Sequence, residues 1–140
     1  MGVRQLSVFV ENKRGSLHEI SDELARAGID IRSMCIADTS DYGIVRIIAD
    51  DPIKAQKVLT DAGHTANIRT VTAFAVPDQP GGLAKVLSIL EEKGVNIEYL
   101  YALVNTKADK AYAAMRTDEH EIAEEILRSS GVELLNEDNL

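Results

Sequence analysis

The chain has 140 residues, of which 45% are hydrophobic, and a formal net charge of −8 at pH 7. This hydrophobic content is sufficient for a folded core in one domain or two small ones, and the acidic excess argues against nucleic-acid binding, which needs clustered Lys and Arg. A single cysteine, Cys35, excludes an intrachain disulfide and a zinc site built on cysteines.

The first half of the chain has the pattern of strand, helix, strand, strand, helix, strand. The predicted strands are Val3–Val10, Asp30–Ala37, Ile44–Ala49 and His64–Ile68. The first helix carries an apolar stripe of Leu17, Ile20 and Leu24 and ends at Gly28. Asp51-Pro52 starts the second helix, because Asp is a good N-cap and Pro fits the first turn.

The second half repeats this order. The predicted strands are Val71–Val76, Asn96–Val104, Ala111–Arg116 and Val132–Leu135. One helix carries Leu83, Val86, Leu87 and Leu90 and ends at Gly94, and Asp118 with Glu121 indicates a capping box at the start of the other. The segment between the halves, HTANIRTVTAFAV, contains no Pro or Gly, so we expect strand rather than a flexible linker.

The two halves are copies of one unit. Residues 6–36 align without a gap on residues 72–102, a shift of 66 positions. The identical pairs are Val10 with Val76, Gly15 with Gly81, Leu17 with Leu83, Leu24 with Leu90, Gly28 with Gly94 and Ile31 with Ile97. We therefore predict two domains, residues 1–68 and 69–140.

Each copy has the order βαββαβ, which predicts an α+β fold of two ferredoxin-like units with antiparallel sheets and both helices on one face. The other face of such a sheet is polar when it meets water. Here Ile44, Val45, Ile47 and Ile48 place aliphatic side chains on both faces. A second layer would explain this pattern, and we expect a homodimer.

The stretch DQPGGLAKVLSILEEKGVNI (Asp78–Ile97) resembles the ACT domain family, whose units have a D/N-x-P-G-x-L turn and a helix that ends in G-[VI]-[ND]-I. The earlier copy, NKRGSLHEISDELARAGIDI (Asn12–Ile31), keeps this pattern except that Arg14 replaces the proline. The resemblance covers nearly the whole chain and implies a tandem pair of ACT domains.

The resemblance implies a small-molecule sensor, typically for an amino acid, with its ligand held where two ACT units meet. The strand–helix loop of one unit and the residue opening the second strand of its neighbour would contact the ligand. Carried over by motif, the ligand-binding residues are Asn12, Gly15, Ser16, Leu17, Asp30, Asp78, Pro80, Gly81, Gly82, Leu83 and Asn96.

Residue chemistry supports such a site. Backbone N–H groups at a helix N-terminus bind a carboxylate, and Asn or Asp side chains accept hydrogen bonds from an ammonium group. Ser16-x-x-Glu19 indicates a capping box that would occupy the amides of the first helix, whereas Gly82 would leave those of the second open. Crossing the units pairs Asp78 with Asp30, and Asn12 with Asn96; the first pair repels a carboxylate and the second is neutral. Either loop therefore remains a candidate.

We expect an amino-acid-binding regulatory protein that signals to a partner metabolic enzyme. Two alternatives remain: a regulatory small subunit of a biosynthetic enzyme such as acetolactate synthase, and a purely structural dimerisation module. His18, His64 and His120 have no metal-ligand spacing, and no paired nucleophile and base indicates an enzyme. We expect neither a cofactor, a metal nor a nucleic-acid partner.

No apolar stretch approaches the roughly 20 residues that span a bilayer. The N-terminal residues lack the apolar core and cleavage site of a secretory signal. We therefore expect a cytoplasmic protein without membrane contact.

Overall fold

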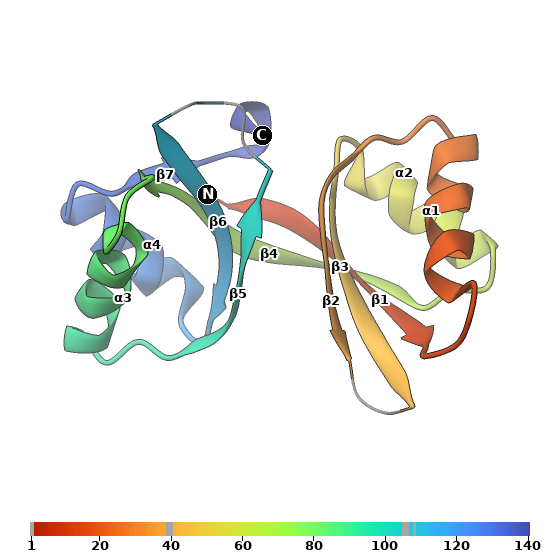
Figure 1. The fold of residues 1–140 in the computed structure, drawn as a ribbon, viewed down its shortest axis with the longest axis horizontal. Coiled ribbons are helices and arrows are strands. Elements are labelled where there is room, and N and C mark those ends of the chain that lie inside the picture. Colours follow the sequence, from red (N-terminus) through yellow and green to blue (C-terminus); the bar gives the residue numbers. More distant parts are fainter. Residues whose placement is uncertain (1, 39–40, 105–106, 108) are drawn as a thin grey trace. The chain divides into compact units, whose positions relative to one another are not determined.

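A computed structural model of the chain describes residues 2–38, 41–104, 107 and 109–140 (Figure 1). The helices are α1 (Ser16–Arg26), α2 (Pro52–Asp61), α3 (Gly82–Glu92) and α4 (His120–Ser129), followed by a short 3₁₀ turn, Glu137–Asn139. The strands are β1 (Val3–Glu11), β2 (Ile31–Asp38), β3 (Tyr42–Ala49), β4 (Ala66–Pro77), β5 (Ile97–Leu103), β6 (Lys110–Thr117) and β7 (Glu133–Leu135). The α+β prediction is confirmed.

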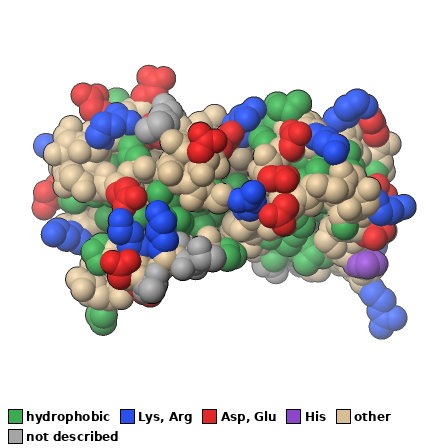
Figure 2. Space-filling view, turned by 90° about the horizontal axis from the view of Figure 1, so that it is seen from above, with side chains coloured by type: hydrophobic (Ala, Val, Ile, Leu, Met, Phe, Trp, Pro, Cys, Tyr) green, Lys and Arg blue, Asp and Glu red, His purple; other side chains and the backbone are tan. Residues whose placement is uncertain are grey.

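The described residues form two compact units. One consists of Arg4–Arg69, and the other of Thr70–Leu140 together with the N-terminal Gly2 and Val3. Acidic and basic side chains are interspersed over both units on the face shown in Figure 2.

In the first unit the antiparallel sheet has the order β2-β3-β1, and the beginning of β4 follows β1. The Phe9 amide donates a hydrogen bond to the Thr65 carbonyl at 3.0 Å beside this junction. α1 and α2 cover one face of this sheet (Figure 1). Alternate residues of β1 bury their side chains beneath the helices, which contribute Ile20 and Leu24 from α1 and Ala55 and Leu59 from α2.

The second unit repeats this arrangement with the order β5-β6-β4-β7. α3 and α4 lie on one face of its sheet (Figure 1). The core between the layers contains Phe74 and Met115 from the strands and Leu90 and Leu127 from the helices. Both units therefore have the predicted ferredoxin-like βαββαβ arrangement.

β3 carries aliphatic side chains on both faces, as the sequence predicts. Val45 and Ile47 point into the core of the first unit. Ile44 and Ile48 alternate with them and therefore face away from the helices, on either side of Arg46.

The segment between the copies is one strand rather than a strand and a linker. β4 runs for 12 residues without a break, so the predicted strands His64–Ile68 and Val71–Val76 are joined. β-branched residues such as Ile68, Thr70 and Val71 suit an extended backbone, and no Pro or Gly occurs before Pro77.

Candidate functional site

The turns that precede α1 and α3 have the same backbone hydrogen bonds. In the first unit the Ser16 amide donates to the Lys13 carbonyl at 3.3 Å, and the Glu19 amide donates to the Gly15 carbonyl at 2.9 Å. In the second unit the Gly82 amide donates to Gln79 at 3.1 Å, and the Lys85 amide to Gly81 at 3.1 Å. The motif shared by the two copies is therefore one three-dimensional structure built twice.

A glycine in the left-handed region forms the N-cap of each helix. Gly15 and Gly81 both have φ of 86°, a conformation that costs other L-residues free energy. Neither helix receives a side-chain cap from the part of the chain that the structure describes. Within the described residues, the amides of Leu17 and His18 and those of Leu83 and Ala84 make no hydrogen bond. Each turn thus presents open donors at the positive end of a helix.

The capping boxes expected from the sequence are wrong. Ser16 is the first helical residue rather than the N-cap, and its side chain is buried without capping α1. In α4 the N-cap is Glu119, also without a side-chain cap. The predicted cap of α2 is confirmed, because Asp51 Oδ1 accepts a hydrogen bond from the Lys54 amide at 3.0 Å.

Gly82, the first residue of α3, has a packing role. A Cβ atom at this position would lie 2.4 Å from the Pro77 carbonyl oxygen, far inside contact distance. In the first unit Ser16 occupies the equivalent position, so the two turns differ in how closely the strand end approaches the helix.

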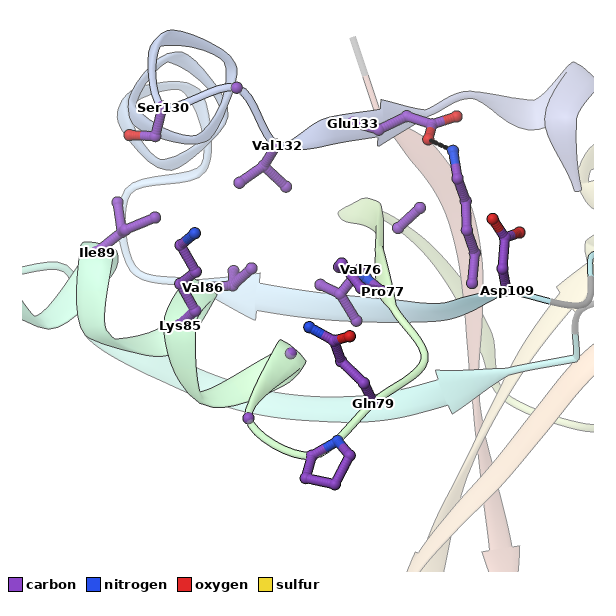
Figure 3. A pocket seen from close by; sticks show the side chains of 16 residues that line it. Val76, Pro77, Gln79, Lys85, Val86, Ile89, Asp109, Ser130, Val132 and Glu133 are labelled. Carbon is purple, nitrogen blue, oxygen red and sulfur yellow. Dashed lines mark hydrogen bonds and ion pairs between the residues drawn. The ribbon is translucent and has the colours of Figure 1, made fainter.

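Beside the second turn, the second unit contains a cavity of about 500 Å³ (Figure 3). Its walls come from the end of β4, the first turns of α3, the start of β6 and the turn between α4 and β7. The Gln79 and Lys85 side chains reach toward the space from one side, and Val132 points toward it from the α4–β7 turn. An ion pair between Lys110 Nζ and Glu133 Oε2 closes one end, and this carboxylate raises the pKa of Lys110.

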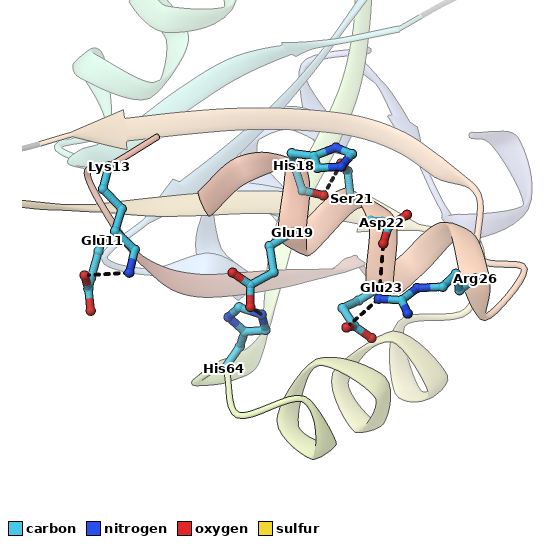
Figure 4. Close-up of polar contacts among 9 residues, drawn as sticks. All are labelled: Glu11, Lys13, His18, Glu19, Ser21, Asp22, Glu23, Arg26 and His64. Carbon is cyan, nitrogen blue, oxygen red and sulfur yellow. Dashed lines mark hydrogen bonds and ion pairs between the residues drawn. The ribbon is translucent and has the colours of Figure 1, made fainter. Parts of the chain in front are cut away.

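The first unit contains the equivalent cavity, reduced to about 270 Å³. Its nine lining residues all have counterparts among those of the second cavity, at a shift of 66 or 68 positions. Glu19 stands where the second unit has Lys85, and His64 where it has Val132. These two side chains face each other across the space, with His64 Nε2 3.8 Å from Glu19 Oε1 (Figure 4).

A family model described as the ACT domain pair matches residues 1–140. The chain belongs to the ACT domain pair family. The resemblance read from the two turn motifs is therefore confirmed, and ACT membership supports a regulatory, small-molecule-sensing role for the chain.

Solved structures show the same ACT pair fold. A protein from Bacteroides thetaiotaomicron is 41% identical with a TM-score of 0.90, over 96% of this chain and 92% of that one. The ligand-free regulatory subunit of aspartate kinase from Thermus thermophilus is 17% identical with a TM-score of 0.70, over 94% and 92% of the two chains. At that identity the likeness concerns the fold. A comparison with curated proteins finds no match.

Within one ACT unit the residues expected to bind the ligand lie at two opposite ends of the sheet. β1 ends beside the start of β3, where Glu11 pairs with Tyr42, whereas β2 begins beside the end of β3, where Ile31 pairs with Ala49. Asp30 is therefore remote from the Asn12–Leu17 turn of its own unit. The same registers in the second unit separate Asn96 from the Asp78–Leu83 turn.

Sequence reasoning missed most of the cavity. Gln79, Val132 and Glu133 have no motif of their own. The alignment of the repeats could have located part of the cavity wall, because Gly63–Thr65 and Gly131–Glu133 occupy the same turn after the second helix of each ACT unit.

Among the described residues, no group of three or more His, Cys, Asp or Glu side chains is arranged to hold a metal ion. No helix in the same part of the chain is long and apolar enough to cross a bilayer.

Proposed function

We propose that this ACT pair is an amino-acid-binding regulatory protein that catalyses no reaction and signals to a partner metabolic enzyme in the cytoplasm. The observation that carries the proposal is the duplicated turn, in which a left-handed glycine leaves helix amides open at two matched positions. Family membership supports the same role.

An α-amino acid has two charged groups, and the proposed residues offer partners for both. The amides after Gly15 or Gly81 would receive the carboxylate. Asn96 or Asp30 of a neighbouring unit would receive the ammonium group, because their oxygens accept hydrogen bonds. We propose Asn12, Gly15, Ser16, Leu17 and Asn96 as one site. The other site consists of Asp78, Pro80, Gly81, Gly82, Leu83 and Asp30.

The exposure of one residue in each turn favours contact with something outside its own unit. Leu17 is 41% exposed and Leu83 is 37% exposed, although both lie on the stripe that the helical periodicity directs inward. An aliphatic ligand or a neighbouring unit would bury these side chains. We propose that a homodimer supplies the second layer expected for the aliphatic sheet face.

A ligand that bound one arrangement of ACT units more tightly than another would shift the population toward it. The partner enzyme would then respond to that arrangement. The size of the response is limited by the difference between the affinities of the ligand for the two states.

Titration calorimetry of the full chain against the twenty amino acids tests the proposal. At least one amino acid should bind, and Asn12→Ala or Asn96→Ala should weaken its binding about tenfold or more if the first turn receives it. Asp30→Ala should do the same if the second turn receives it. Asn67→Ala, a substitution of an exposed β4 residue outside these sets, is the matched control. Absence of heat with every amino acid would contradict the proposal.

The two alternative roles, a regulatory subunit of an enzyme and a purely structural dimerisation module, can be distinguished by experiment. A regulatory subunit would co-purify with a large catalytic chain in stoichiometric amount. The structural neighbour from Thermus thermophilus is a regulatory subunit of aspartate kinase. A purely structural module would bind no amino acid and would still form dimers in light scattering.

A further inference from the structure

We infer that the cavity of the second ACT unit is a binding site for a small aliphatic carboxylate. It shares Pro80, Gly81 and Gly82 with the second proposed amino-acid site but extends from this turn toward Lys85 and Val132 within one unit. The cavity measures about 500 Å³, within the range of small-molecule sites. It lies inside one unit, so it requires neither a second unit nor Asp30 or Asn96. The inference goes beyond the proposed function, which places an amino acid between units.

The polar attraction in this cavity comes from Lys85. Its ammonium group makes no ion pair or hydrogen bond with the described residues, and Figure 3 shows the side chain directed toward the space between α3 and the α4–β7 turn. Gln79 reaches toward the same space from the turn. An ammonium group beside a carboxamide provides donors for a carboxylate.

The remaining acidic and basic groups at the cavity limit the charge of the ligand. Lys110 is engaged by Glu133. Asp109 lies at the same end and would repel a second negative charge. Ser130 donates its hydroxyl hydrogen to the Ile126 carbonyl at 2.8 Å and offers no donor to a ligand. These contacts favour a ligand with one carboxylate at the Lys85 end.

Apolar side chains line the space beside Lys85 on α3 and across from it on the α4–β7 turn. Val86 is 4% exposed, and Ile89 and Val132 are partly buried around the same space (Figure 3). A ligand with a branched chain of a few carbons would cover these side chains, at about 0.8 kcal/mol for each buried methylene group. Acetate would reach Lys85 and leave this wall uncovered.

The equivalent cavity of the first unit is smaller and has a different lining. There Glu19 and His64 replace Lys85 and Val132, and the space is reduced to about 270 Å³. The anionic Glu19 repels a carboxylate at the position where Lys85 attracts one. The two substitutions therefore place an anion at the position of the attracting cation and a histidine at the position of an apolar side chain, so the proposed site differs between the copies.

Titration of the full ¹⁵N-labelled chain with 4-methylpentanoate tests the inference by NMR. The amide signals of Val86, Ile89 and Val132 should shift in a saturable manner. The neutral analogue 4-methylpentanamide and acetate should each bind about tenfold more weakly or worse. Lys85→Gln should lose about tenfold in affinity, and Lys93→Gln, at the exposed end of the same helix, should bind as the unchanged chain does.

Three results would overturn the inference: no saturable shift, shifts confined to residues outside the cavity, or equal affinity in Lys85→Gln. Circular dichroism should show that both lysine variants retain the fold. Failure here is distinguishable from failure of the proposed function, because Lys85 belongs to neither proposed amino-acid site. If an amino acid binds but 4-methylpentanoate does not, this inference fails and the proposed function stands.

Discussion

The Asp118 carboxylate accepts a hydrogen bond from the Asn96 amide at 3.1 Å, while the Asn96 carbonyl accepts one from the Asp118 amide at 3.2 Å. Asp50 and Asp30 repeat both contacts in the first unit, each at 3.1 Å. Asp50 and Asp118 fix the backbone at Asp30 and Asn96, the residues immediately before β2 and β5.

Asp118→Ala should lower the free energy of unfolding by about 1 kcal/mol, because a charged acceptor for an otherwise open amide is lost. Asp50→Ala should have a similar effect. Asp118→Asn keeps an oxygen acceptor and should lose less. Chemical denaturation measures the three values, and equal losses in Asp118→Ala and Asp118→Asn would show that the hydrogen bond is unimportant.

The starts of α2 and α4 differ in capping. Asp51→Ala removes the only side-chain cap that the described part of α2 receives at its N-terminus and should cost about 1 kcal/mol. Glu119→Ala, at the corresponding N-cap of α4, removes no cap and should be close to neutral. Urea unfolding of the two variants tests this contrast, and it fails if the Glu119 variant is destabilised as much.

The adjacent glycines of the second turn should respond differently to alanine. Gly81→Ala meets no atom within 4 Å and should cost about 1 kcal/mol for the left-handed backbone alone. Gly82→Ala should cost more, because the new Cβ would lie 2.4 Å from a backbone oxygen that cannot rotate away. Melting temperatures from thermal unfolding compare the two variants. A higher melting temperature for Gly82→Ala than for Gly81→Ala would contradict this geometry.

The Lys110–Glu133 ion pair should make the stability of the fold depend on pH. The hydrogen bond and charge of Glu133 raise the pKa of Lys110 above its ordinary value. Because the folded-state pKa exceeds the unfolded one, the stabilisation is fully present below the unfolded pKa and is lost as pH rises through the folded pKa. The difference in melting temperature between the unchanged chain and Lys110→Met should therefore shrink at about pH 11 relative to about pH 8.

Lys93→Met provides the control for that comparison. Lys93 is exposed and makes no ion pair with the described residues, so its substitution should produce no such pH-dependent difference. A constant difference for Lys110→Met across this range would mean that the pair does not contribute through its charge.

Exchanging two side chains between the cavities should exchange their binding properties. Lys85→Glu with Val132→His reproduces the Glu19 and His64 side chains in the second unit and should abolish binding of 4-methylpentanoate. Glu19→Lys with His64→Val should create binding in the first unit, with amide shifts at Ser16 and Thr65. NMR titration distinguishes the outcomes, and unchanged binding in the first double variant would contradict the role given to these residues.

The sequence predicts the elements well because strand and helix periodicities were supported by turn residues at both ends. Its errors lie in the first turns of helices. The motif Ser16-x-x-Glu19 indicates a capping box only if Ser16 is the N-cap, and the left-handed Gly15 takes that position one residue earlier. Leu17 and Leu83 were placed on the inward stripe, but periodicity does not show whether anything lies beneath a helix's first turn.

The cavity is a tertiary feature that local patterns do not describe. Val132 follows α4 and Lys85 lies in α3, and only the packing of both helices on one sheet brings them together. By contrast, the turns before α1 and α3 were predictable, because their conformation depends on neighbouring residues and a glycine.

The unbroken β4 has a consequence for dissecting this molecule. A cut at the predicted boundary between residues 68 and 69 would pass through a hydrogen-bonded strand, and Val3, the first residue of β1, groups with the second unit. Half-length fragments would therefore carry severed strands with exposed edges, which promote aggregation. The duplicated halves are distinct in sequence and core, yet we expect either half to aggregate when it is expressed alone.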